Sequence, residues 1–187
     1  MKEALTKGAQ TAVTMLAKQD GFLGNGKVRI PLPESLQKVE GLMRAFGMGK
    51  YSDELVTTMN RAAETAVVEA KPLLVNAVKG MSVQDAKGIL TGGDDTATQY
   101  FKRSASATLS ARFLPIVAKA TQKVKLAGKG AKLGLVDKKD ADLNSYVTQK
   151  ALDGLFLMIA EEEKKIRRDP LGSASSVISK VSGAIGK

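Results

Sequence analysis

The fold is decided by residues 55–81, LVTTMNRAAETAVVEAKPLLVNAVKGM, in which apolar side chains return at steps of three and four residues. Those apolar positions are Leu55, Val56, Met59, Ala62, Ala63, Ala66, Val67, Ala70, Leu73, Leu74, Ala77, Val78 and Met81. The spacing predicts a long amphipathic helix with one buried side, capped at its start by Ser52 or Asp53. Pro72 lacks an N–H donor, so we expect this helix to be kinked or split in its middle.

The rest of the chain repeats this helical spacing between breaks that contain Gly or Pro. Helices are predicted at residues 2–18, 33–46, 96–104, 109–124 and 140–168, with a short one opening at Ser82. Ala, Leu, Val, Ile and Met supply most of the apolar residues (43% of the chain), and aromatic residues make up only 4%. We therefore predict one all-α domain over residues 1–187, a bundle of about six to eight helices with kinked long members.

Three segments are expected to differ from regular helix. Residues 28–33 contain Pro31 and Pro33, which predict an extended stretch. Residues 125–139 are rich in Gly and Lys and predict a flexible basic loop. Residues 172–187 carry Val177, Ile178, Val181 and Ile185 among Ser and Gly, and we expect a weakly ordered tail.

The composition excludes several kinds of chemistry, because the chain contains no Cys and no His. Disulfides, zinc sites built from thiolate or imidazole, a Cys nucleophile and a Ser-His-Asp triad are all excluded. Any reaction would depend on carboxylates, Lys, Arg, Tyr, Ser or Thr. No stretch approaches the roughly 20 consecutive apolar residues that span a bilayer, so no transmembrane segment is predicted.

The net charge is +10, from 29 basic and 19 acidic residues, which favours an anionic partner. Between Lys119 and Lys139 seven lysines accompany one acid, Asp137. The candidate anion surface consists of Lys119, Lys123, Lys125, Lys129 and Lys132. No aromatic or arginine residues are interleaved with these lysines, so we do not expect sequence-specific nucleic-acid binding. Acidic lipid headgroups or an anionic envelope polymer would fit, and a solvated loop without a partner is the simpler alternative.

The loop Thr91-Gly92-Gly93-Asp94-Asp95 is the most distinctive local motif. Asp94 and Asp95 are candidate oxygen ligands for Ca²⁺ or Mg²⁺. The simpler interpretation is a helix stop followed by an Asp cap for the next helix, and we favour it. Accordingly, no cofactor is predicted.

Charged residues on the helices supply the other ligand-binding candidates. Arg61 and Glu64 are three residues apart and can pair on one helix face, while Lys71 flanks Pro72. These residues would line a polar pocket near the kink or form an internal salt-bridge network, and we favour the network. Tyr100 is a further ligand-binding candidate.

The acidic end of the last long helix contains Glu161, Glu162 and Glu163. The four-residue spacing predicts the pairs Glu161 with Lys165 and Glu163 with Arg167 on a solvated face. If the helices pack suitably, Glu161 and Glu162 would instead join the two aspartates of the Gly-Gly-Asp-Asp loop in a carboxylate cluster of the kind that a hydrolase needs.

Several phrases of the sequence together resemble one known family. They are Arg29-Ile30-Pro31-Leu32-Pro33, Asn60-Arg61-Ala62-Ala63-Glu64, Ala70-Lys71-Pro72, Ile89-Leu90-Thr91-Gly92-Gly93-Asp94-Asp95, Gln99-Tyr100-Phe101, Lys150-Ala151-Leu152-Asp153-Gly154-Leu155-Phe156, Ile159-Ala160-Glu161-Glu162-Glu163 and Ile166-Arg167-Arg168-Asp169-Pro170. Over nearly its whole length the chain resembles the bacterial family called domain of unknown function 4197. The resemblance implies an all-α protein of a Gram-negative type of bacterium and brings no activity with it.

Members of this family usually carry an N-terminal export or lipoprotein signal, so the resemblance implies a periplasmic protein. Here Met1 leads directly into a polar, helix-like segment, and we expect the signal peptide to have been removed. The function predicted is a non-enzymatic binding or interaction protein of the cell envelope with a basic surface for an anionic partner. The alternative is a hydrolase, dependent on a divalent metal or on carboxylates, centred on the Gly-Gly-Asp-Asp loop. The sequence predicts no oligomeric state.

Overall fold

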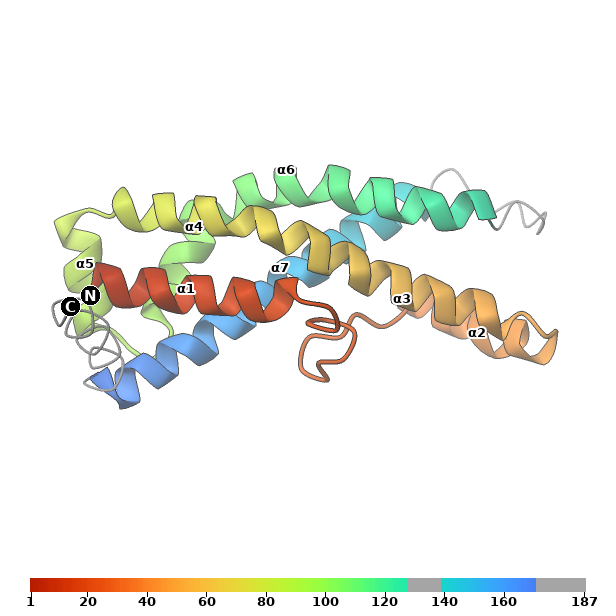
Figure 1. Cartoon of the computed structure of the whole chain (residues 1–187), viewed down its shortest axis with the longest axis horizontal. Coiled ribbons are helices and arrows are strands. Elements are labelled where there is room, and N and C mark those ends of the chain that lie inside the picture. The colour runs from red at the N-terminus through yellow and green to blue at the C-terminus, as the bar shows by residue number, and fades with distance from the viewer. Residues whose placement is uncertain (128–138, 171–187) are drawn as a thin grey trace, which may run out of the picture.

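The computed structural model describes residues 1–127 and 139–170, with side chains described for residues 1–122 and 143–170 (Figure 1). Its elements are α1 (Lys2–Ala17), α2 (Glu34–Ala45), α3 (Gly49–Ala66), a 3₁₀ turn η1 (Val67–Glu69), α4 (Ala70–Lys79), α5 (Val83–Thr91), α6 (Thr96–Ala127) and α7 (Lys139–Arg168). The described residues contain no strand. The predicted all-α helical bundle is therefore confirmed.

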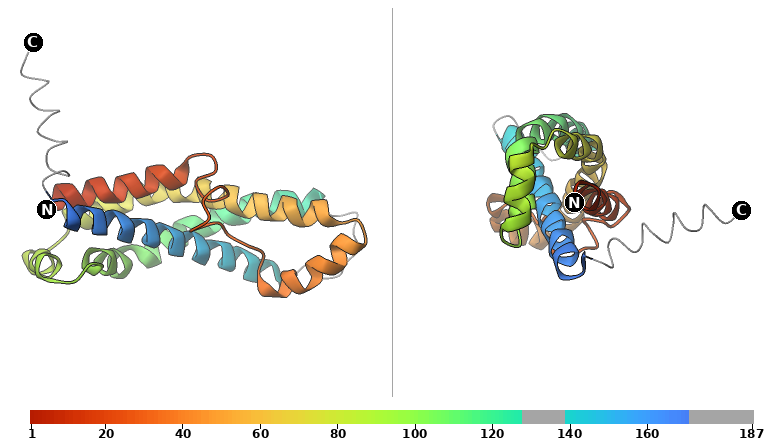
Figure 2. Two further views of the ribbon diagram at one scale, coloured as in Figure 1. Left: turned by 90° about the horizontal axis from the view of Figure 1, so that it is seen from below. Right: turned by 90° about the vertical axis from the view of Figure 1, so that its left-hand side faces the viewer.

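The helices form an elongated bundle (Figures 1 and 2). Helix α6 packs along both α3 and α7, while α1 packs against α7 and α4. The short helix α5 lies at the end of the bundle that holds the N-terminus, and α2 lies at the opposite end. None of the described helices combines the length and the apolar character needed to cross a bilayer.

The predicted inward side of residues 55–81 is confirmed. Leu55, Met59, Ala62, Ala63, Ala66, Val67, Ala70, Leu74, Val78 and Met81 are all buried, and Val56, Leu73 and Ala77 pack partly buried against the same core. The predicted helix is split into α3 and α4 by the 3₁₀ turn that ends at Glu69. Pro72 consequently lies in the first turn of α4, where a missing N–H costs little because those donors lack helical partners.

The prediction of two separate helices at 96–104 and 109–124 is wrong. One helix, α6, runs unbroken through both ranges for 32 residues. Seven of its buried side chains lie four residues apart, at Ala97, Phe101, Ala105, Leu109, Phe113, Val117 and Thr121. Each step of four advances about 400° around the axis, so the buried stripe winds around the helix by about 40° per step. A winding stripe does not show the fixed face that the sequence analysis looked for. Pro115 does not end the helix, because it and Ala111, whose carbonyl it frees, are both exposed to water.

The connection between α6 and α7 also differs from its predicted bounds. The predicted flexible basic loop at 125–139 loses residues at both ends, since α6 extends to Ala127 and α7 begins at Lys139. Residues 128–138 lie outside the described part of the chain, and so does the predicted tail at 172–187.

Helix α2 lies at the periphery of the bundle. It packs on α3 and contains no buried residue. Leu42 is 61% exposed and Phe46, at its C-cap, is 74% exposed. Leu36 packs partly buried against the core, so the core reaches only the start of α2.

Candidate functional site

The segment between α1 and α2 is fastened to α3 by a buried asparagine. Asn60 is fully buried, and its Oδ1 accepts the N–H of Ile30 at 2.8 Å. Its Nδ2 donates to the carbonyls of Ile30 at 2.9 Å and Val56 at 2.8 Å. The side chain thus satisfies both backbone groups of a residue that belongs to no helix.

Glu64, one turn further along α3, binds the same segment through its carboxylate. Its Oε1 accepts the N–H groups of Phe22 at 3.1 Å and Leu23 at 3.2 Å. Its Oε2 pairs with Arg61 Nη1 at 2.7 Å, and Arg61 Nη2 reaches Asp20 Oδ1 at 2.9 Å. Asp20 itself has a φ of 64°, which lets the chain turn sharply after α1. Arg61 and Glu64 therefore form the internal salt-bridge network that we favoured, and Lys71 stands apart from it, exposed on α4.

Helix α7 completes the binding of this segment. Tyr146 donates its hydroxyl to the carbonyl of Pro31 at 2.8 Å, and Lys27 Nζ meets Glu161 Oε1 at 2.5 Å. Gly154 leaves room for Phe22, because a Cβ at this position would lie 2.8 Å from Phe22 Cε1. The segment is held by both polar contacts and close packing.

A second buried carboxylate, Glu163 of α7, caps the start of α6. Its oxygens accept the N–H groups of Ala97 at 2.9 Å and Thr98 at 2.8 Å, and the hydroxyl of Thr98 at 2.8 Å. Arg167 pairs with it at 2.7 Å, as the spacing predicted, and also donates to the carbonyl of Ile89 at 2.9 Å. Glu163 is only 4% exposed, so this is a buried junction of α5, α6 and α7 and not the predicted solvated face.

The Gly-Gly-Asp-Asp loop connects α5 to α6, with Asp94 and Asp95 exposed. The Asp cap predicted for the next helix is corrected, because Glu163 reaches the free N–H groups of α6 from another helix. The carboxylate of Asp95 instead accepts a hydrogen bond from Gln99 at 3.1 Å. Within the described residues, no group of three or more carboxylates is arranged to hold a metal ion.

The remaining candidates bind separate partners. The predicted pair of Glu161 with Lys165 is wrong. Lys165 pairs with Glu162 at 2.6 Å, and Glu161 pairs with Lys27. Tyr100 donates its hydroxyl to the carbonyl of Ala77 at 2.8 Å, and burial raises the pKa of this phenol. The structure thus distributes the predicted ligand-binding residues over several contacts between helices.

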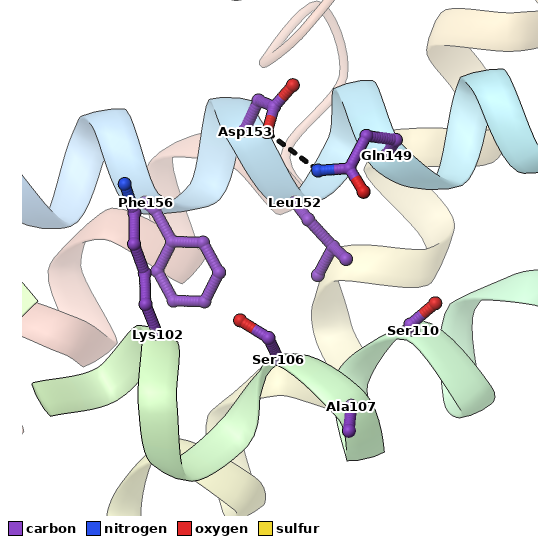
Figure 3. A pocket seen from close by; sticks show the side chains of 8 residues that line it. All are labelled: Lys102, Ser106, Ala107, Ser110, Gln149, Leu152, Asp153 and Phe156. Carbon is purple, nitrogen blue, oxygen red and sulfur yellow. Dashed lines mark hydrogen bonds between the residues drawn. The ribbon is translucent and has the colours of Figure 1, made fainter. Parts of the chain in front are cut away.

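A groove of about 450 Å³ lies between α6 and α7 (Figure 3). It is lined by Lys102, Ser106, Ala107 and Ser110 of α6 and by Gln149, Leu152, Asp153 and Phe156 of α7. Gln149 donates to Asp153 at 2.9 Å, and Lys102 Nζ lies 5.9 Å from the centre of the Phe156 ring. The volume is within the range of small-molecule sites, roughly 300–1,000 Å³.

Sequence reasoning missed three functional features, two of which left a signal. Asn60 follows Met59 on the apolar stripe of α3, and Glu163 continues the stripe of α7 four residues after Ile159. A polar residue on a buried stripe must be paired, which marks both positions as buried contacts. The groove left no such signal, because its polar residues are ordinary surface types whose meeting depends on how two distant helices cross.

Positive charge is concentrated on α6. It carries Lys102, Arg103, Arg112, Lys119, Lys123 and Lys125 and has no acidic residue, whereas α7 carries equal numbers of acids and bases. The first four of these side chains are exposed. Of the predicted anion surface, Lys119 lies on α6 with an exposed side chain. Lys123 and Lys125 also belong to α6, but their side chains lie outside the described part of the chain. Lys129 and Lys132 lie outside it entirely.

Comparison with known proteins gives one match. A family model described as "Protein of unknown function (DUF4197)" matches residues 1–183, nearly the whole chain. No curated protein matches the chain, and neither does any solved structure. The matched length agrees with the resemblance that runs from the Arg-Ile-Pro-Leu-Pro phrase to the end of α7. The chain therefore belongs to the DUF4197 family.

Proposed function

We propose that the protein is a non-catalytic binding protein of the cell envelope, located in the periplasm, which uses the cationic surface of α6 to hold an anionic partner. The partner that we propose is an acidic lipid surface. An anionic envelope polymer carries the same sign of charge and is the alternative partner. The observation that carries this proposal is a helix of 32 residues with six basic side chains and no acidic one.

The distribution of ion pairs supports this assignment. The salt bridges named here join Lys27, Arg44, Arg61, Lys165 and Arg167 to acids that all lie outside α6. Those acids are therefore already neutralised by bases outside α6. Among the described residues, neither Arg112 nor Lys119 has an acid within salt-bridge distance, so their charges face solvent. Each basic residue near an acidic bilayer contributes about 1 kcal/mol of attraction.

Vesicle co-sedimentation tests the proposal. We expect the protein to sediment with vesicles of phosphatidylglycerol at about 0.05 M salt, to be released at about 0.5 M salt, and to stay in solution with phosphatidylcholine vesicles. The double variant Arg112→Gln/Lys119→Gln should bind about 30-fold more weakly, because it loses about 2 kcal/mol of attraction. The matched control Lys18→Gln/Lys87→Gln removes the same charge from exposed positions on other parts of the surface.

Equal losses in the two double variants would show that net charge, and not α6, determines binding. Recovery that is independent of salt and of headgroup would overturn the proposal. Retention on a polyglutamate resin without sedimentation on acidic vesicles would assign the polymer as the partner.

The hydrolase alternative stays a prediction. The exposed carboxylates of Asp94 and Asp95 are the residues on which it depends. A specific Ca²⁺ or Mg²⁺ site would raise the melting temperature of the native protein, and Asp94→Asn/Asp95→Asn would abolish that increase. An unchanged melting temperature at millimolar concentrations of either ion would argue against it.

A further inference from the structure

The groove between α6 and α7 has features of a binding site that the outward cations of α6 do not explain (Figure 3). We propose that it binds a zwitterionic small molecule, whose anionic group lies at Lys102 and whose ammonium group lies at Asp153, with an apolar part between them. This goes beyond the proposed function, because it concerns a groove with one charge of each sign and not an excess of positive charge.

The donors for the anion lie on the wall of the groove that α6 forms. Lys102, Ser106 and Ser110 follow one another at four-residue steps and all line the groove. Lys102 holds its ammonium over the Phe156 ring and has no acidic partner among the described residues. Neither serine hydroxyl has a hydrogen-bond partner within that same part of the chain, whereas the nearby Ser104 donates to the carbonyl of Tyr100 at 2.8 Å. Lys102 and Ser106, one turn apart, supply an ammonium and a free hydroxyl, which are donors that a phosphate or carboxylate accepts, while Ser110 lies two turns from Lys102 along the groove.

The end for the cation is formed by α7. Asp153 pairs only with an amide, Gln149, at 2.9 Å among the described residues, so its negative charge is not neutralised. Asp153 precedes Phe156 by three residues, so the two positions are separated by about 4.5 Å along the helix axis. The opposite charges are therefore offset along the groove, which excludes a simple anion from the Asp153 end and favours a ligand that carries both charges.

The floor of the groove is apolar. Leu152 is 4% exposed and Phe156 is 5% exposed, and the parts that remain accessible line the groove. A ligand therefore buries an apolar segment here while its charged ends pair with the walls. The chemistry is shared by the phosphoethanolamine headgroup of a lipid, whose charges are joined by two methylene groups, and by a free apolar dipeptide, whose charges are joined by a peptide unit that carries apolar side chains.

Short-chain probes below their micelle concentration separate these sources without any vesicle. Dihexanoyl phosphatidylethanolamine, dihexanoyl phosphatidylglycerol and the dipeptide Leu-Leu would each be titrated into the ¹⁵N-labelled protein. We expect a saturable shift of the amide signals of residues 149–156 with the ethanolamine lipid or with the dipeptide, and a weaker one with the glycerol lipid. Whichever zwitterion binds identifies the source.

Paired variants make the test specific. Lys102→Gln should weaken binding of the zwitterion about tenfold or more, and Asp153→Asn should do the same. Asp153→Asn should also strengthen binding of the glycerol lipid, since it removes a repulsive charge; a purely structural role would not produce this reversal. Lys164→Gln removes the same charge from an exposed position of α7 outside the groove and should leave binding unchanged.

The absence of saturable shifts with every probe would overturn the proposal. So would equal affinity for the glycerol and ethanolamine lipids, or equal losses in Lys102→Gln and Lys164→Gln. Circular dichroism of each variant confirms that a loss of binding is not a loss of fold. Because no vesicle is used and Arg112 and Lys119 are untouched, this proposal and the proposed function can fail independently.

Discussion

Glu64 and Glu163 are two buried carboxylates that solve the same problem in different places. Each accepts two backbone N–H groups from another part of the chain, and each pairs with an arginine on its own helix. Glu64 holds an irregular segment, whereas Glu163 closes the start of a helix. The arginines differ as well: the side chain of Arg61 is 36% exposed and that of Arg167 is 24% exposed.

The difference shows how much of the fold depends on each carboxylate. Arg61 ends on Asp20, which is itself half exposed, so water can replace part of that network. Arg167 ends on a backbone carbonyl of α5, so the Glu163 junction connects three helices. A buried carboxylate is tolerated only when its donors compensate for lost hydration, and removing it leaves those donors unpaired.

The largest effect should come from Glu163→Ala. It leaves the first N–H groups of α6 and the guanidinium of Arg167 without their acceptor, and we expect a loss of about 3–5 kcal/mol in the free energy of unfolding. Urea denaturation measures it. Glu162→Ala removes a neighbouring acid whose partner, Lys165, is exposed. It should lower the free energy of unfolding by at most about 1 kcal/mol. A similar cost for both variants would contradict the central role of Glu163.

Glu64→Ala should have a smaller effect, about 2–3 kcal/mol, because two N–H groups lose their acceptor while Arg61 turns to water and Asp20. The same denaturation experiment checks it. Limited proteolysis between Lys18 and Lys27 should accelerate in this variant and not in Glu163→Ala. If Glu64→Ala proved the more costly of the two, the exposure of the paired arginine would not determine the ranking.

Gly154→Ala tests the packing of the Glu64 region without touching its hydrogen bonds. The new methyl group would lie 2.8 Å from the ring of Phe22, so Phe22 must move. We expect a net loss of about 1 kcal/mol, since overpacking costs about 1–3 kcal/mol and alanine returns up to about 1 kcal/mol of helix propensity. Gly88→Ala, in α5 with open space around its Cβ position, is the stabilising control.

The smallest effect belongs to Asp85, a surface carboxylate that does for α5 what Glu163 does for α6. Hydrogen bonds from the side chain and then the backbone of Ser82 lower the pKa of Asp85 from its ordinary value of 3.8. The stability it contributes is therefore present above pH 3.8 and is lost as the pH falls through the lower, folded-state pKa. Melting curves of wild type and Asp85→Asn should differ near neutral pH and converge in acid. A difference that did not shrink as the pH fell below 3.8 would contradict this assignment.

Much of the fold could be predicted because the buried residues of α3 and α4 keep to one side of a helix. The extent of α6 could not, since its stripe winds and each half, taken alone, suggests a separate short helix. The pair Arg61 and Glu64 could be predicted from spacing on one helix. The acceptors of Glu163 could not, because Ala97 and Thr98 lie 66 and 65 residues away and meet it only through the packing of α6 on α7.

The groove was beyond prediction for the same reason. Lys102 and Asp153 have nothing in common in the sequence, and the crossing of two long helices brings them to opposite walls. The charge of α6 was partly predictable, because its lysine-rich C-terminal part was recognised, whereas Arg103 and Arg112 were not included. Side chains that act within one helix are accessible to pattern reasoning, and those that act across helices require the crossing geometry.

Helix α2 has a consequence for how the molecule opens. With no buried residue and α3 as its main neighbour, α2 can detach and melt while the core around Leu16, Phe22 and Met59 stays intact. Its amide hydrogens should therefore exchange with solvent through such a local opening, at a rate set by α2 alone and insensitive to mutations that weaken the whole protein. Exchange of this kind would make the release of α2 from α3 a separate opening, distinct from the unfolding of the core.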